Sequence, residues 1–190
     1  MIDQKKNNER LNPERLPGDP TVTQLVERMI RVDHAGEFGA ARIYEGQLAV
    51  LKNHPSAQLI QHMAEKERKH LDHFEELIVE RGIRPTVLSP VWHLSGFILG
   101  AASAALGKDA AMACTEAVET VIDKHYEKQI NQLGPDEQDL KEALQEFRRD
   151  EIDHRDSAIE SGAKNAPGYQ TLGATVRAST RLAIWLSERL

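Results

Sequence analysis

The chain has 190 residues, a length that favours a single domain with a substantial buried core. Its formal net charge of −6 argues against a nucleic-acid-binding protein, which would need a basic surface. The single cysteine, Cys114, excludes an intramolecular disulfide and favours a reducing compartment. Few aromatic residues (5%) and abundant Ala, Leu, Glu, Arg and Gln favour an all-α fold.

Residues 1–20 are polar and contain three prolines, so we expect a flexible leader before a folded domain at 21–190. The first residues lack the apolar segment of a secretory signal. The chain has neither a Gly-rich dinucleotide-binding fingerprint nor a P-loop.

Two helices are predicted in the first part of the domain. Inward-facing residues recur at steps of three and four from Thr21 to about Asn53, as in a helix with one face in a core. Pro55 breaks this helix and suits the first turn of the next one, which we expect Gly82 to cap at its C-terminus.

The most apolar part of the chain is residues 85–107, and no Asp, Glu, Lys or Arg lies between Arg84 and Lys108. The segment is long enough to span a bilayer. However, it is rich in Ala, Ser and Gly, carries two prolines near its start and has no partner span. We therefore favour a helix that lies across the bundle or in a membrane interface. The long connection 83–108 also suits the crossover of a ferritin-like four-helix bundle.

A second pair of helices follows this crossover. Asp109 is the expected N-cap of a helix that runs to about Leu133. Residues 134–136 (Gly-Pro-Asp) predict a turn, and the next helix ends near Gly162. Residues 167–190 predict a C-terminal helix that packs on the bundle or touches lipid headgroups. The expected architecture is therefore a ferritin-like four-helix bundle with an extra apolar crossover helix and a C-terminal helix.

The predicted bundle helices carry a repeated pattern of a lone glutamate followed by Glu-x-x-His. Residues three apart share a helix face, so each Glu-x-x-His can present both side chains to one site. A helical bundle that holds two metal ions uses this arrangement twice. The six candidate metal ligands are Glu37, Glu67, His70, Glu119, Glu151 and His154.

Helix geometry places these side chains at matching heights. Glu37 and Glu67 lie about 24 and about 21 Å from the turn at Asn53, at about 1.5 Å per residue. Glu119 and Glu151 lie about 23 and about 26 Å from the second turn, near residue 134. The lone glutamates are 82 residues apart, and the two Glu-x-x-His motifs are 84 apart. This internal repeat predicts two halves related by a pseudo-twofold axis.

The alternative interpretation of these six residues is a structural polar core. Four buried carboxylates without partners would each cost several kcal/mol or stay protonated, whereas two divalent cations would balance their charge. We therefore favour a dimetal site. Oxygen-rich ligation with one imidazole per ion suits iron or manganese better than zinc. Glu116 could compete with Glu119 for the lone position, but Glu119 fits the spacing better.

Several further residues are weaker candidates. His34 and Tyr126 fall on or beside the inner stripes and could orient a ligand, although core packing explains them equally well. Asp153 and Asp156 flank the second motif and could accept a hydrogen bond from an imidazole. His125 and Cys114 are interpreted as structural, and His54, His62, His73 and His93 receive no functional role.

Four stretches of the sequence resemble the demethoxyubiquinone hydroxylase family. They are Arg31–Ala40, which contains Asp-His-Ala-Gly-Glu, and Arg84–Leu88, Ala111–Thr115 and Leu186–Leu190. The resemblance covers the chain after about residue 21. It implies that the six residues above are the ligands of a di-iron centre. It also implies the O2-dependent hydroxylation of a polyprenyl demethoxy-benzoquinone in ubiquinone synthesis, with electrons from NADH.

The same resemblance implies a location and partners. The family works at the membrane face that holds the quinone, which is the cytoplasmic face in a bacterium or the matrix face in a mitochondrion. In eukaryotic members, a lipid-binding protein helps to deliver the substrate. Two other functions remain open at this point. One is a ferritin- or rubrerythrin-like iron oxidase or peroxidase, and the other is a metal-free helical lipid-binding protein.

Overall fold

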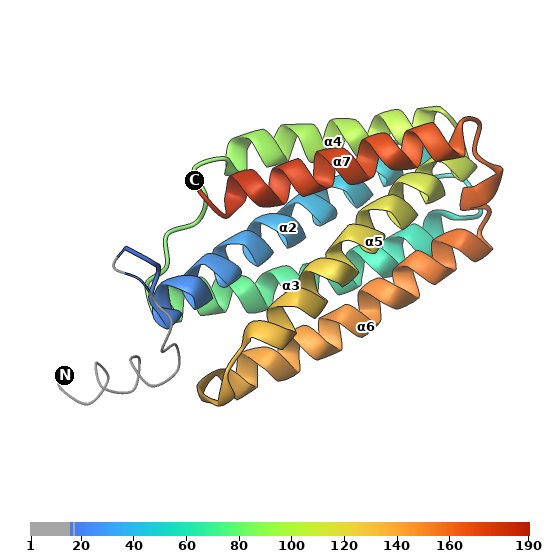
Figure 1. Ribbon diagram of the computed structural model, residues 1–190. Coiled ribbons are helices and arrows are strands. Elements are labelled where there is room, and N and C mark those ends of the chain that lie inside the picture. The colour runs from blue at the N-terminus through green and yellow to red at the C-terminus, as the bar shows by residue number, and fades with distance from the viewer. Residues whose placement is uncertain (1–15, 17) are drawn as a thin grey trace.

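The computed structural model describes residue 16 and residues 18–190, and within these the chain is helical and contains no strand. Most of the predicted leader lies outside the described residues. Six α-helices account for most of the fold (Figure 1). They are α2 (Val22–Leu51), α3 (Ala57–Arg81), α4 (Ser89–Ala105), α5 (Lys108–Gln132), α6 (Gln138–Glu160) and α7 (Tyr169–Ser187).

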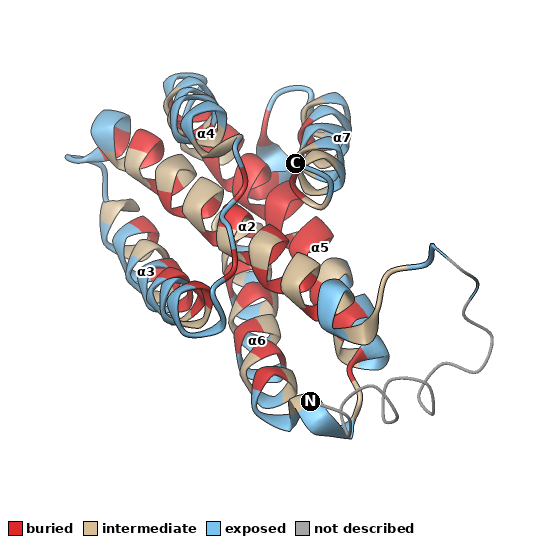
Figure 2. Ribbon diagram, turned by 90° about the vertical axis from the view of Figure 1, so that its left-hand side faces the viewer, coloured by how far each residue is buried: buried red, intermediate tan, exposed pale blue. Residues whose placement is uncertain are grey.

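The helices form a four-helix bundle with two additional helices on one side. α2 pairs with α3 and α5 pairs with α6, while α4 packs on α2 and α7 packs on α5. Figures 1 and 2 show α4 and α7 above α2 and α5, on the side away from α3 and α6. The described helices therefore form two similar three-helix units, α2–α4 and α5–α7, and the predicted all-α bundle with a crossover helix is confirmed.

The helix ends follow the local sequence with one exception. Thr21 caps α2 in a capping box with Gln24, and Gly82 ends α3 in the left-handed conformation (φ 63°). The expectation that Asp109 is the N-cap of α5 is wrong, because α5 begins one residue earlier and its N-cap is Gly107. Gly107 has a φ of 111°, which lets the chain turn directly from α4 into α5 and leaves Asp109 in the first helical turn.

The apolar segment forms α4, which is 17 residues long and lies along α2. In the described part of the chain, no helix combines the length and the hydropathy needed to cross a bilayer. The side of α4 that faces the bundle consists of small residues, and Gly96, Gly100, Ser103 and Ala104 are buried. Small residues allow the backbones of α4 and α2 to approach closely.

Gly100 is the tightest point of this contact, and we expect its replacement by alanine to destabilise the fold. A Cβ atom at this position would overlap the backbone carbonyl of Ile43 in α2. The helices would have to separate, at a cost of about 1–3 kcal/mol in the free energy of unfolding. A Cβ atom on Gly36 meets no atom within 4 Å, so Gly36→Ala should instead stabilise α2 by about 0.5–1 kcal/mol. Urea unfolding of both variants, followed by circular dichroism, measures this difference; equal stabilities would contradict the tight contact.

Candidate metal centre

The six predicted ligands converge in the middle of the bundle. Each is at most 2% exposed. They form two overlapping groups, and within each group one ligand atom from every residue lies within 4.8 Å of the others. The groups are Glu37, Glu67, His70 and Glu151, and Glu67, Glu119, Glu151 and His154.

Glu67 and Glu151 belong to both groups, so they lie where bridging carboxylates would lie between two ions. Each remaining pair consists of one lone glutamate and one histidine. Glu37 and His70 complete the first group, and Glu119 and His154 complete the second. This is the arrangement of one imidazole, one terminal carboxylate and two shared carboxylates per ion that ferritin-like dimetal proteins use.

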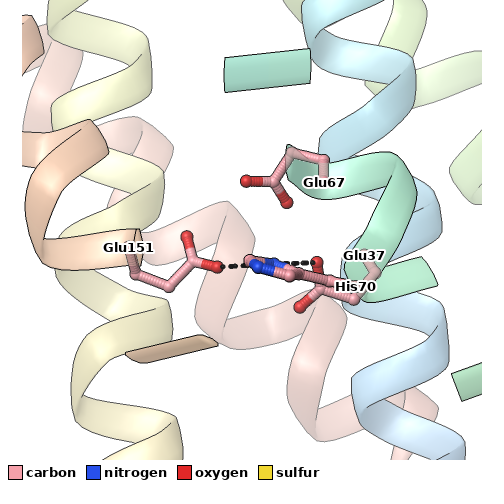
Figure 3. A group of neighbouring side chains, drawn as sticks. All are labelled: Glu37, Glu67, His70 and Glu151. Atoms are coloured by element: carbon pink, nitrogen blue, oxygen red, sulfur yellow. Dashed lines mark ion pairs between the residues drawn. The ribbon is translucent and has the colours of Figure 1, made fainter. Parts of the chain in front are cut away.

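The same ring nitrogen of each histidine faces the carboxylates. The Nδ1 atom of His70 lies 3.4 Å from Glu37 Oε2 and 3.4 Å from Glu151 Oε1 (Figure 3). The Nδ1 atom of His154 lies 2.9 Å from Glu67 Oε1. Both imidazoles therefore present Nδ1 to the interior of the cluster, which leaves Nε2 for contacts outside it.

Two tyrosines hold the lone glutamates in place. The Tyr44 hydroxyl in α2 donates a hydrogen bond to Glu119 Oε1 in α5, at 2.7 Å. The Tyr126 hydroxyl in α5 donates to Glu37 Oε1 in α2. Burial, followed by the charge of nearby glutamates, raises the pKa of both phenols well above the ordinary value, so both remain protonated donors. The sequence suggested that Tyr126 could orient a ligand, whereas Tyr44 was not among the candidates.

Asp150 contacts the outer nitrogen of one imidazole. Its Oδ2 atom lies 3.1 Å from His70 Nε2, and its Oδ1 atom accepts a hydrogen bond from Lys66 Nζ at 2.6 Å. Asp153 and Asp156, the two candidates for such a contact, form no hydrogen bond with an imidazole. Both lie on the exposed side of α6. Asp150 is also on α6, but it reaches His70 on the facing helix, α3.

The other candidates lie outside the two ligand groups. Glu116 is 8% exposed, accepts a hydrogen bond from Thr120 and lies 3.7 Å from Arg177 of α7. It therefore belongs to the contact between α5 and α7. His34 is partly buried and is in neither group. His125 contacts Asp33 at 3.1 Å, in agreement with a structural role.

The carboxylates crowd one another in the absence of cations. Burial, followed by the charges of the other glutamates, raises the pKa of Glu67 and of Glu151 well above the ordinary value. Burial also raises the pKa of Glu119 to about 7 and lowers that of His154 to about 4. Burial raises the pKa of Glu37, but the contacts with His70, Glu67 and Tyr126 together outweigh it, so the pKa is lowered. Without metal, carboxyl groups of the cluster therefore remain protonated at a higher pH than usual, and a cation would displace these protons on binding.

Unpaired polar atoms show that these residues fit metal ions. Buried polar groups in proteins are nearly always hydrogen-bonded, so a concentration of unpaired ones indicates a missing partner. Each of the six residues has at least one buried side-chain N or O atom without a hydrogen-bond partner among the described residues. These atoms include Nδ1 of both histidines and both oxygens of Glu151. Four carboxylates and two imidazoles without a thiolate form a donor set suited to iron or manganese.

The raised pKa of Glu119 leads to a prediction for the metal-free protein. The unfolded side chain loses its proton near pH 4.5, whereas the folded one keeps it to about pH 7. Its protonation therefore stabilises the fold fully below pH 4.5, and this contribution, on the order of 3 kcal/mol, is lost as the pH rises through 7. We expect Glu119→Gln to unfold in urea with a weaker fall in stability between pH 5 and 8 than the wild type. If the free energy of unfolding fell equally with pH in the two proteins, the protonation of Glu119 would not be the cause of the fall.

An apolar groove reaches the bundle beside the cluster. It has a volume of about 470 Å³ and lies between α2, α4, α5 and α7. Gly36 and Ala40 line it on α2, and Val118 and Ile122 line it on α5. These four residues flank Glu37 and Glu119 in the sequence, so the floor of the groove is formed by the same helix turns that carry the two lone glutamates.

Comparison with known proteins agrees with this architecture. The family described as "Ubiquinone biosynthesis protein COQ7" matches residues 24–187. A protein of Rhodospirillum rubrum named 3-demethoxyubiquinol 3-hydroxylase is 49% identical over 93% of this chain and 84% of its own length. Two proteins are named NADPH-dependent 3-demethoxyubiquinone 3-hydroxylase, mitochondrial. The one from Dictyostelium discoideum is 54% identical over 88% of this chain and 78% of its own length. The human one is 47% identical over 87% of this chain and 78% of its own length. The chain therefore belongs to the COQ7 family of ubiquinone biosynthesis proteins.

Proposed function

We propose that this protein is a di-iron monooxygenase that hydroxylates the ring of a polyprenyl demethoxy-benzoquinone in ubiquinone biosynthesis. The observation that carries the proposal is the pair of overlapping Glu/His groups next to an apolar groove. The names of the relatives support the reaction, because they specify 3-hydroxylation of demethoxyubiquinone or demethoxyubiquinol. Hydroxylation by O2 requires a group that can transfer electrons, and the buried donor set suits iron in that role.

In this proposal Glu37 and His70 would hold one ion, Glu119 and His154 would hold the other, and Glu67 and Glu151 would be shared by both. When bound, the iron pair would supply the redox chemistry that activates O2. Tyr126 and Tyr44 orient the lone glutamates from the opposite helix. The apolar wall formed by α2, α4, α5 and α7 receives the quinone and excludes water from its ring.

The overall reaction balances with a reduced nicotinamide nucleotide as the two-electron donor. One oxygen atom of O2 enters the C–H bond of the ring, and the other leaves as water with two protons, one of them from the nucleotide and one from solvent. The family resemblance implied NADH, whereas the names of the Dictyostelium and human relatives specify NADPH. We therefore propose a reduced nicotinamide nucleotide as the electron donor. Hydroxylation rates measured with NADH and with NADPH identify which of the two is used.

We also propose that the protein binds peripherally to the membrane that holds its substrate. Apolar side chains are exposed on both helices that flank the groove. Leu94 and Ile98 on α4 are 61% and 54% exposed, and Leu182 and Trp185 on α7 are 56% and 51% exposed. Arg189 stacks on Trp185 at 4.2 Å, a pair suited to the boundary between apolar chains and anionic headgroups. Several relatives are named mitochondrial. We propose that a lipid-binding partner protein docks on the same apolar surface.

The test is single-turnover and steady-state hydroxylation of a short-tailed demethoxyquinone by the iron-loaded protein under ¹⁸O2. We expect one labelled oxygen atom in the quinone product for each NADH or NADPH consumed. Rapid nucleotide- or ferrous-dependent reduction of O2 or H2O2 without quinone hydroxylation would instead indicate a ferritin- or rubrerythrin-like oxidase or peroxidase. Binding of lipid vesicles by protein that retains no metal would indicate the lipid-binding alternative.

A further inference from the structure

The two halves of the centre repeat closely, including the residues around the proposed ligands. In α2 and α5, the residues 82 apart are Glu37 and Glu119, Tyr44 and Tyr126, and Gln47 and Gln129. In α3 and α6, the residues 84 apart are Glu67 and Glu151, and His70 and His154. The hydrogen bonds follow the same symmetry, because Tyr44 reaches Glu119 and Tyr126 reaches Glu37. A residue that breaks the repeat next to a ligand would therefore make the two ion positions different.

Such a break occurs immediately before the Glu-x-x-His motifs. Asp150 precedes Glu151, and the equivalent residue before Glu67 is Lys66. Asp150 contacts Nε2 of His70 across the bundle at 3.1 Å. By symmetry Lys66 occupies the position from which a side chain would contact Nε2 of His154. An ammonium group, however, cannot accept a hydrogen bond from an imidazole N–H. Lys66 instead donates to Asp150 at 2.6 Å.

His154 therefore lacks the partner that His70 has. Its Nε2 atom is buried and has no hydrogen-bond partner among the described residues. His154 lines a pocket of about 330 Å³ between α3 and α6, together with polar side chains that include Lys66, Ser157 and the carboxylates of Asp153, Asp156 and Glu160. None of these carboxylates forms a hydrogen bond with His154. A pocket of this size and polarity can hold several water molecules. Water is thus the natural acceptor for the outer nitrogen of His154, in the place that a carboxylate occupies for His70.

We propose that the two ion positions of the dimetal centre differ in affinity, with Asp150 as the positioning residue that makes the Glu37–His70 position the tighter one. The inference rests on the dimetal centre proposed above. A carboxylate that accepts from the outer nitrogen fixes the orientation and tautomer of an imidazole ligand and increases its basicity, which is worth about 10–100-fold in metal affinity. The Glu119–His154 position lacks this support and adjoins the polar pocket, so its ion exchanges first.

The release of Fe(II) to a chelator tests this difference. The full chain is loaded anaerobically with Fe(II), mixed with excess ferrozine, and followed by absorbance. We expect two phases of about one iron each, separated by at least about tenfold in rate. Asp150→Asn should accelerate the slow phase by about tenfold or more and leave the fast phase unchanged. Lys66→Met removes the contact with Asp150 but leaves the carboxylate beside His70, so it should retain a slow phase.

A second variant, which adds a carboxylate beside His154, tests the same difference if Asp150→Asn does not fold. Lys66→Asp places a carboxylate at the position equivalent to Asp150, and it should slow the fast phase towards the slow one. Circular dichroism and thermal unfolding confirm the fold of each variant. Two irons released in a single phase by the wild type would overturn the inequivalence and leave the proposed function intact. A chain that binds no iron would overturn the dimetal centre itself.

Discussion

Glu151→Ala is expected to abolish both metal binding and quinone hydroxylation. Glu151 is in both ligand groups, and both of its oxygens are buried without hydrogen-bond partners. Its loss removes a shared ligand from each position, so iron content should fall from about two per chain to well below one. Hydroxylation should fall by about three orders of magnitude or more, equivalent to about 4 kcal/mol in activation free energy. Metal analysis and product formation measure the two effects on the same sample.

Glu116→Ala is the matched control for this substitution. Glu116 is also a buried glutamate of the bundle, and it lies three residues before a proposed ligand. Its contacts are with Thr120 and Arg177 rather than with the cluster, so its loss should reduce stability without changing iron content. If both variants lose iron equally, general destabilisation of the bundle explains the result and the ligand assignment is contradicted.

Gly39→Leu is expected to impair the use of the quinone without affecting the metal centre. Gly39 lines the apolar groove on α2, and a Cβ atom there meets no atom within 4 Å. A leucine side chain would therefore fit the helix and occupy the space proposed for the substrate. We expect kcat/KM for a polyprenyl quinone to fall by roughly tenfold to a hundredfold. The measurement compares substrates with long and short tails at equal iron content.

The same change at a position outside the groove serves as a control. Gly134 lies between α5 and α6, has a φ of −80°, and has no atom within 4 Å of its Cβ position. Gly134→Leu should leave kcat/KM within about twofold of the wild type, as expected for a surface substitution. Equal losses in the two variants would show that the groove is not where the substrate binds.

The sequence predicted that the six side chains of the cluster lie together, because the relevant spacing is local. Glu-x-x-His places two side chains on one face of a helix, and the distance of each motif from a helical turn sets its height in the bundle. Position in the bundle, and not burial, separates Glu119 from Glu116, since both residues are buried but only Glu119 joins a ligand group.

The contacts that cross between helices were harder to predict. Asp150 was missed because it touches an imidazole of the facing helix, whereas Asp153 and Asp156 were chosen for their place beside His154 in the sequence. The available signal was the repeat, in which Asp150 is equivalent to Lys66. Tyr44 was not among the candidates, but its hydroxyl contacts Glu119 because α2 and α5 lie side by side (Figure 1). The groove depends on how α4 and α7 pack over α2 and α5, which local spacing does not encode.

The most direct test of the central claim is the magnetic coupling of iron in the wild-type protein. The chain is reconstituted anaerobically with Fe(II), analysed for metal, and partly oxidised for electron paramagnetic resonance. We predict about two irons per chain and the spin-½ signal of an antiferromagnetically coupled Fe(II)–Fe(III) pair, because Glu67 and Glu151 lie within reach of both positions. One iron per chain, or two irons with only the signals of isolated high-spin Fe(III), would contradict a centre bridged by these two glutamates.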